Sequence, residues 1–132
     1  MASDHFSSSI SEKTVPEVEK ALSPSTKHGA DVRFHGAVRD LEDEKEISGI
    51  EYSSYPGMAE AELEKIGAEM GEGFPNHLAM VHHCVGFVPV GEASILIRVQ
   101  TKHSAAAFEI SREYLRRIKE TVPIWKKPVF VG

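Results

Sequence analysis

The sequence of 132 residues has one cysteine, no long apolar run and a negative net charge. A lone cysteine, Cys84, excludes a disulfide within the chain and is typical of a reducing compartment. No stretch approaches the roughly 20 apolar residues that a membrane-spanning helix needs. The first ten residues have neither a basic start nor an apolar run, so we expect no secretory signal. These absences predict a cytoplasmic protein that does not act in a membrane.

The net charge of −5 argues against a general nucleic-acid binder. The charge is unevenly divided, because residues 101–132 carry seven Lys or Arg and three Asp or Glu, whereas the first hundred carry eight and seventeen. A basic end on an acidic protein indicates an anionic ligand or partner. Part of the excess has a simpler explanation, since cations in the last turns of a helix stabilise its dipole. We assign Arg116 and Arg117 to that structural role.

Hydrophobic periodicity predicts an α+β fold, with helices packed against a mainly antiparallel sheet. The apolar, β-branched run 93–99 is expected to be the central strand. The Ser-rich residues 1–13 are expected to be disordered, and residues 14–132 to form one domain. Residues 40–46 are expected to be a solvated acidic turn. The predicted helices cover residues 14–22, 58–70 and 104–120, and the predicted strands cover residues 30–38, 47–55, 77–88, 93–99 and 124–131.

Two lysines near the C-terminus form the most informative pattern. In a continuous helix, Lys119 and Lys126 would lie about 10 Å apart along the axis. Pro123 prevents this, because proline cannot continue a helix and moves the preceding residue out of helical geometry. The chain must therefore turn near Val122, and Lys126 can fold back toward Lys119. Two ammonium groups brought together in this way predict an anion-binding site.

Two further segments offer anion-binding groups. Gly36 permits close approach to the backbone, and Arg39 has the planar fork that suits a phosphate, although a bulged strand with a surface arginine explains the segment equally simply. His103 precedes Ser104 at the expected start of a helix, where free N–H groups and the helix dipole favour anions. A capping loop, with Ser104 as the cap and Phe108 on the buried side, is the alternative there.

Zinc is not predicted at His82-His83-Cys84. Neighbouring residues on a strand point to opposite faces, and neither Cys-x-x-Cys nor His-x-x-x-His accompanies the three. The phosphate-binding and nucleotide-binding glycine motifs and the serine-hydrolase elbow are also absent. We therefore expect no metal and no cofactor.

From residue 30 to residue 127 the sequence resembles the large, catalytic subunit of molybdopterin synthase. The motifs are weak one by one but specific when taken together, in order and at family-like spacing. They are Gly36-Ala-Val-Arg39, Tyr55-Pro-Gly-Met58-Ala59, His83-Cys-Val-Gly86, Gly91, His103-Ser-Ala-Ala-Ala-Phe108-Glu, and Lys119 with Pro123-Ile-Trp-Lys126.

The resemblance implies a homodimer of the α/β hammerhead type that holds a small ubiquitin-like sulfur carrier on each copy. The carrier's Gly-Gly terminus, as a thiocarboxylate, would deliver sulfur to cyclic pyranopterin monophosphate and form the dithiolene of molybdopterin. Arg39 and His103 would hold the phosphate and pterin, and Lys126 would contact substrate as a second cation. Lys119 would stabilise charge on the thiocarboxylate, relay protons or capture an acyl group.

Three departures from the family pattern leave a second reading open. The family commonly has arginine where this chain has Cys84 and Ser104, and it usually continues past the position of Gly132. The arginine at the Ser104 position belongs to the family's anion pocket. The alternative is therefore a non-catalytic or repurposed dimeric homologue that binds a ubiquitin-like carrier or another phosphorylated metabolite.

Overall fold

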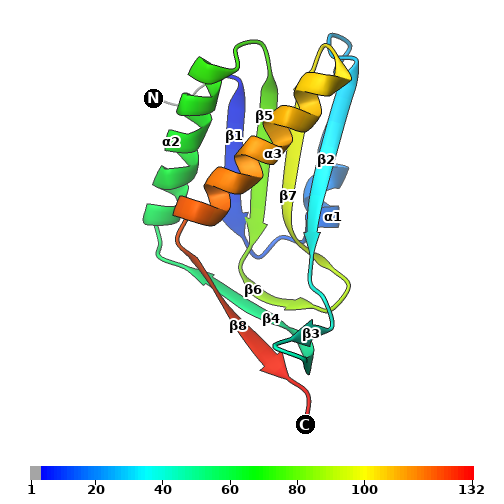
Figure 1. The fold of residues 1–132 in the computed structure, drawn as a ribbon, viewed down its shortest axis with the longest axis vertical. Coiled ribbons are helices and arrows are strands. Elements are labelled where there is room, and N and C mark those ends of the chain that lie inside the picture. The colour runs from blue at the N-terminus through cyan, green and yellow to red at the C-terminus, as the bar shows by residue number, and fades with distance from the viewer. Residues whose placement is uncertain (1–3) are drawn as a thin grey trace.

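The computed structural model describes residues 4–132, which form three helices and eight strands (Figure 1). The expected α+β composition is present, and most expected elements appear within a few residues of their predicted bounds. In chain order the elements are β1 (Phe6–Ser11), α1 (Val15–Lys20), β2 (Ala30–Ala37), β3 (Leu41–Glu42), β4 (Lys45–Ser54), α2 (Met58–Gly73), β5 (Leu78–Cys84), β6 (Gly86–Pro89), β7 (Ala93–Thr101), α3 (Ser104–Thr121) and β8 (Ile124–Phe130).

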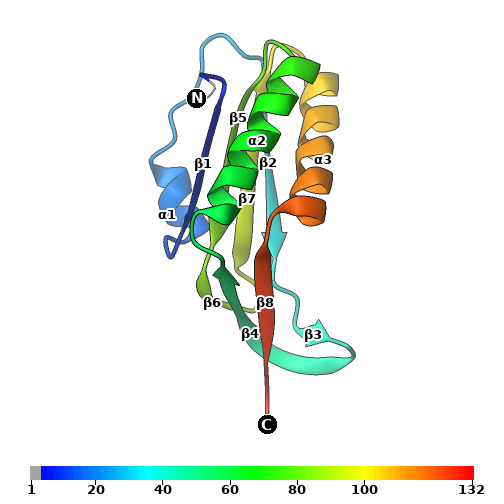
Figure 2. The same cartoon turned by 90° about the vertical axis from the view of Figure 1, so that its left-hand side faces the viewer.

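The main sheet has the strand order β1-β5-β7-β2. Its β1–β5 pair is parallel, and the β5–β7 and β2–β7 pairs are antiparallel. Helices α2 and α3 cover one face, and the short α1 lies against the other (Figure 2). The prediction that residues 93–99 form a central strand is confirmed, because β7 has a neighbour on each side and Ile97 and Val99 are fully buried.

A second sheet, in which β4 pairs with β3, β6 and β8, extends from one end of the main sheet (Figure 1). Residues 77–88 were expected to be one strand, and this is wrong because they divide into β5 and β6, which belong to different sheets. The chain changes sheet at Gly86, whose φ of +89° favours glycine. The acidic segment 40–46 is more ordered than expected. It contains β3 and a tight turn in which Asp43 and Glu44 both have positive φ.

The expectation of a disordered segment 1–13 is wrong for residues 6–11, and residues 1–3 lie outside the described part of the chain. Residues 6–11 form β1, which pairs in register with β5. Phe6 is 5% exposed and its ring stacks on Tyr114 at 5.7 Å between centroids. Serine has a weak strand propensity, so composition favoured disorder. Backbone pairing along a sheet edge and one buried aromatic ring stabilise the strand instead.

The helix starts and buried faces were predicted with mixed success. The Oγ1 atom of Thr14 accepts a hydrogen bond from the Glu17 N–H at 3.2 Å, so the predicted cap of α1 is confirmed. The predicted Ser104 cap is wrong, because His103 is the capping residue of α3 and makes no side-chain cap bond. Phe108 was expected to face the core and is 65% exposed, because the buried stripe runs through Ile110 instead. No helix within residues 4–132 is long and apolar enough to cross a membrane.

Candidate functional site

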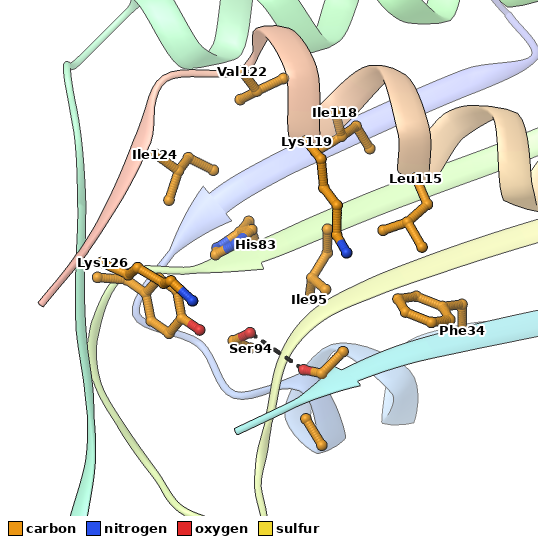
Figure 3. Close-up of a pocket in the computed structure, with 13 residues that line it drawn as sticks. Phe34, His83, Ser94, Ile95, Leu115, Ile118, Lys119, Val122, Ile124 and Lys126 are labelled. Atoms are coloured by element: carbon orange, nitrogen blue, oxygen red, sulfur yellow. Dashed lines mark hydrogen bonds between the residues drawn. The ribbon is translucent and has the colours of Figure 1, made fainter. Parts of the chain in front are cut away.

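A cavity of about 440 Å³ opens where the C-terminal half of α3, the end of the main sheet and the start of β8 meet. The labelled side chains of Lys119, His83, Lys126 and Ser94 surround it (Figure 3). Its described lining includes two lysines and neither Asp nor Glu, so the cavity is basic. The lining residues are Phe34, Gly36, Ala37, Tyr52, His83, Ser94, Ile95, Leu115, Ile118, Lys119, Val122, Ile124 and Lys126.

The two lysines reach this cavity from opposite sides of a chain reversal. Helix α3 ends at Thr121, where the Val122 N–H donates to the Ile118 carbonyl at 3.1 Å. Val122 is extended, with φ −81° and ψ 121°, and Pro123 leads into β8. The prediction that Lys126 folds back toward Lys119 is confirmed, because both line the same cavity. Their chemical roles remain predictions.

Strand β4 positions Lys126 by pairing with β8. Tyr52 lies directly opposite Lys126, so the two side chains share one face of the second sheet. The Tyr52 ring stands edge-on to His83 at 5.1 Å between centroids. The Nζ atom of Lys126 lies 3.5 Å from Oε1 of Glu42 in β3. The acidic hairpin therefore carries a carboxylate that competes with any anion for Lys126.

The floor of the cavity is a row of residues across three paired strands. Ile95 of β7 lies opposite Gly36 of β2 on one side and opposite His83 of β5 on the other. A Cβ atom on Gly36 would lie 2.6 Å from Cγ2 of Ile95, so only glycine leaves this space open. The Ser94 hydroxyl donates to the Gly36 carbonyl at 3.2 Å and fixes the adjacent wall.

His82 and His83 point to opposite faces of β5, as predicted. His82 is fully buried, with Nδ1 2.7 Å from the Ser9 hydroxyl and Nε2 2.8 Å from the Lys13 carbonyl. His83 faces the cavity, and its Nδ1 donates to the Cys84 carbonyl at 2.8 Å. Burial lowers the pKa of His83 below its ordinary value, so the imidazole is neutral at pH 7. Within residues 4–132 no three His, Cys, Asp or Glu side chains are grouped to hold a metal.

Arg39 and His103 do not line this cavity. Arg39 is exposed just beyond β2, and His103 is exposed at the start of α3. Sixteen residues separate His103 from Lys119 along α3, which corresponds to about 24 Å of helix axis. Of the four predicted site residues, one copy of the chain therefore brings together only the two lysines.

Tyr52 and His83 are cavity residues that sequence reasoning missed. His83 was considered as a metal ligand and as part of a family motif but was given no catalytic role, and its position in an apolar strand was the available signal of a buried imidazole. Tyr52 had no local signal, because its place beside Lys126 depends on how β4 pairs with β8. Pairing between strands more than seventy residues apart does not follow from the periodicity of either strand.

Both the sequence and the fold match known proteins. A sequence model of the MoaE protein family matches residues 9–121. The chain belongs to this family. It is 40% identical over 99 residues to the molybdopterin synthase catalytic subunit of Halalkalibacterium halodurans, an alignment that covers 75% of this chain and 64% of that subunit. The chain thus spans slightly less than two thirds of that relative's length.

Solved structures of MoaE-type proteins have the same fold. Molybdopterin synthase from Staphylococcus aureus superposes with a TM-score of 0.84 at 31% identity, over 93% of this chain and 90% of that one. A chain from the complex of subunits 1 and 2 of the Helicobacter pylori molybdopterin-converting factor superposes with a TM-score of 0.73 at 23% identity, over 96% and 90%. The resemblance inferred from the sequence and the predicted fold class are therefore confirmed.

Proposed function

We propose that this MoaE-family chain is the catalytic subunit of a molybdopterin synthase in molybdenum cofactor biosynthesis. It transfers sulfur from the thiocarboxylated terminus of a small carrier protein to cyclic pyranopterin monophosphate, and the product is the dithiolene of molybdopterin. The observation that carries the proposal is the placement of Lys119 and Lys126, from two different elements, in one cavity whose described lining has no carboxylate.

The cavity suits this chemistry because both reactants are anions. The sulfur donor is a thiocarboxylate and the acceptor carries a phosphate, so two ammonium groups favour their approach. Lys119 is exposed at the end of α3 and lines the cavity together with Leu115 and Ile118, so its ammonium is accessible to an anionic reactant. We assign Lys119 to the charge that develops at the thiocarboxylate and Lys126 to substrate binding. The sulfurtransferase reaction requires no metal or redox cofactor.

The sulfur donor is a small ubiquitin-like carrier that ends in Gly-Gly. A tail without side chains can thread into a cavity of about 440 Å³ beside the substrate. The Helicobacter pylori structure with this fold is a complex of two subunits of molybdopterin-converting factor, which supports a small-subunit partner. The free thiol of Cys84 fits a reducing cytoplasm as the setting.

We propose that Arg39 and His103 act on the cavity of a second copy of the chain. Both are exposed and lie outside the cavity of their own copy, so they contribute only if a homodimer brings them to a partner's lysines. Two large subunits, each with one carrier, then form a heterotetramer. Light scattering at micromolar concentration is expected to give the mass of a dimer, and a monomeric mass would remove Arg39 and His103 from the site.

Ser104 favours a second candidate, a homologue that binds a carrier or another phosphorylated metabolite without turnover. Ser104 is exposed at the start of α3 and makes no capping bond there, so neither a structural nor a charged contact replaces the family's arginine. The non-catalytic homologue would form the same dimer and use the same cavity. Only a measurement of turnover distinguishes it from the enzyme.

The deciding experiment mixes the purified chain with thiocarboxylated carrier and cyclic pyranopterin monophosphate and assays the dithiolene product. The enzyme reading predicts product, together with stoichiometric loss of sulfur from the carrier. Tight carrier binding without product supports the non-catalytic homologue. Failure of both carrier binding and turnover contradicts the enzyme and the carrier-binding homologue, and leaves only a homologue that binds another phosphorylated metabolite.

A further inference from the structure

His83 has a polar atom that opens into the lysine cavity and has no use in the function described so far. Its side chain is 9% exposed, and Nδ1 is occupied as the donor to the Cys84 carbonyl. Within residues 4–132, every fully buried side-chain nitrogen or oxygen has a hydrogen-bond partner. No partner contacts Nε2 of His83 in that part of the chain, so Nε2 is accessible. Because His83 lines the cavity, the accessible edge of the ring opens there.

The hydrogen bond from Nδ1 also fixes the tautomer. When Nδ1 carries the proton, Nε2 carries a lone pair and can only accept. The charged and titratable groups facing the ring from neighbouring elements are Lys119 of α3, Lys126 of β8 and Tyr52 of β4, with His82 adjacent on β5. Burial, and to a smaller extent the neighbouring His82, lowers the pKa of His83 and disfavours a second proton, so the ring keeps its lone pair.

We propose that His83 is a catalytic general base that, through Nε2, takes a proton from the water that releases the spent carrier. This inference rests on the proposed sulfur transfer. Once the thiocarboxylate sulfur has bonded to the substrate carbon, with a carbon–oxygen bond of that carbon breaking and its electron pair leaving on oxygen, the carrier remains attached through the sulfur as a thioester. A base that lines the same cavity as the two lysines is placed to activate water against its acyl carbon.

The step balances without an oxidant or reductant. The water oxygen bonds to the acyl carbon, and one water proton passes to Nε2. The carbon–sulfur bond breaks, and its electron pair leaves with the sulfur, which stays on the substrate as a thiolate. The carrier departs as a carboxylic acid, and the imidazolium later returns its proton to solvent. Lys119 and Lys126 stabilise the oxyanion and the thiolate that form.

The His83→Asn variant tests the role, because asparagine can keep the hydrogen bond to the Cys84 carbonyl but has no basic nitrogen in place of Nε2. In a rapid-quench single turnover we expect product release to slow by 10²- to 10⁴-fold. Intact-protein mass spectrometry should show the carrier–substrate thioester accumulating. The wild-type release rate should stay level through pH 6.5, the ordinary pKa of histidine, and fall only at lower pH, because burial lowers the pKa of His83; the variant should lose this dependence.

The matched control is His82→Asn on the same strand, which removes a buried imidazole outside the cavity. This variant should lower the stability of the protein, because the contacts of His82 with Ser9 and Lys13 are structural. Its release rate should stay within about threefold of the wild-type rate. A His83→Asn protein that releases carrier at the wild-type rate, or that slows without accumulating thioester, overturns the proposal. If wild-type protein forms neither product nor thioester, the proposed function itself fails, which is a different result.

A spectroscopic measurement covers the case in which His83→Asn does not fold. Nitrogen-15 NMR of the wild-type histidine rings should show His83 neutral at pH 7, with the proton on Nδ1. A charged ring, or a proton on Nε2, overturns the assignment without any variant.

Discussion

Lys126 of β8 and Glu42 of β3 form an ion pair of 3.5 Å at the edge of the cavity that Lys126 shares with Lys119. The carboxylate is 23% exposed and the ammonium 56% exposed, so water screens the pair and its strength is modest. An anionic substrate that contacts Lys126 competes with Glu42 for its ammonium group. The acidic hairpin therefore lowers the anion affinity of this chain.

Glu42→Gln is expected to tighten binding of cyclic pyranopterin monophosphate by up to about fivefold at low salt, because an exposed ion pair is worth at most about 1 kcal/mol. Calorimetric titration measures the change, and high salt should reduce it. Glu46→Gln, an equal charge change at an exposed position of β4, is the control and should change the affinity less than twofold. Equal effects of the two variants would show that the affinity depends on the net charge of the protein and not on the contact between Glu42 and Lys126.

Lys126→Ala is expected to weaken binding of the same ligand at least tenfold, because a charge-assisted contact is worth roughly 1.5–3 kcal/mol. The adjacent Lys127→Ala is the control, since Lys127 is exposed and does not line the cavity. It should change the dissociation constant by less than about twofold at moderate salt. If the two variants weaken binding alike, Lys126 is not a specific contact.

Phe6→Ala tests the ordered N-terminal strand. Removing a buried ring that stacks on Tyr114 is expected to lower the free energy of unfolding by about 3 kcal/mol. Ser7→Ala, at the next and exposed position of β1, should change it by less than about 0.5 kcal/mol. Urea denaturation compares the two variants. A Phe6→Ala protein of wild-type stability would restore the view that this segment is disordered.

Asp31→Asn is expected to destabilise the protein by about 2 kcal/mol at pH 7, because it leaves the 7%-exposed Arg98 without a charged partner. Hydrogen bonds from Arg98, which outweigh the opposing effect of burial, hold the pKa of Asp31 below its ordinary value. The carboxylate's stabilisation is thus fully present above about pH 4 and is lost as the pH falls through the lowered pKa.

Urea unfolding at pH 7 and pH 2 tests this dependence. The stability difference between wild type and Asp31→Asn should shrink toward acid, whereas the exposed control Asp40→Asn should have little effect at either pH. A difference that does not change with pH would contradict the assigned role of the Asp31 carboxylate.

Local sequence signals predicted the fold where one element's own residues determine the outcome. The Thr14 cap, the central β7 strand and the chain reversal at Pro123 each depend on a few adjacent residues. The failures involve distant partners. Strand β1 is stabilised by pairing with β5 across some seventy residues, and its serines carry no signal of that.

In the candidate site too, the features that depend on adjacent residues were predicted, and those that depend on distant strand pairing were missed. Lys119 and Lys126 could be paired from sequence because a single turn joins them. His83 reaches the cavity through its register with Ile95, and Tyr52 through its register with Lys126. Arg39 and His103 were predicted from local anion-binding features and from the family resemblance, and one chain does not bring them to the lysines.

The most direct test of the account is dithiolene formation by Lys119→Ala, measured with thiocarboxylated carrier and cyclic pyranopterin monophosphate. Loss of a preorganised charge contact is expected to reduce the rate by 10²- to 10³-fold. Carrier binding and thermal stability should stay close to wild type, because Lys119 is exposed at the end of α3. Lys127→Ala should retain wild-type turnover. Near-normal turnover by Lys119→Ala, with the same carrier and substrate, would contradict the claim that this cavity performs sulfur transfer.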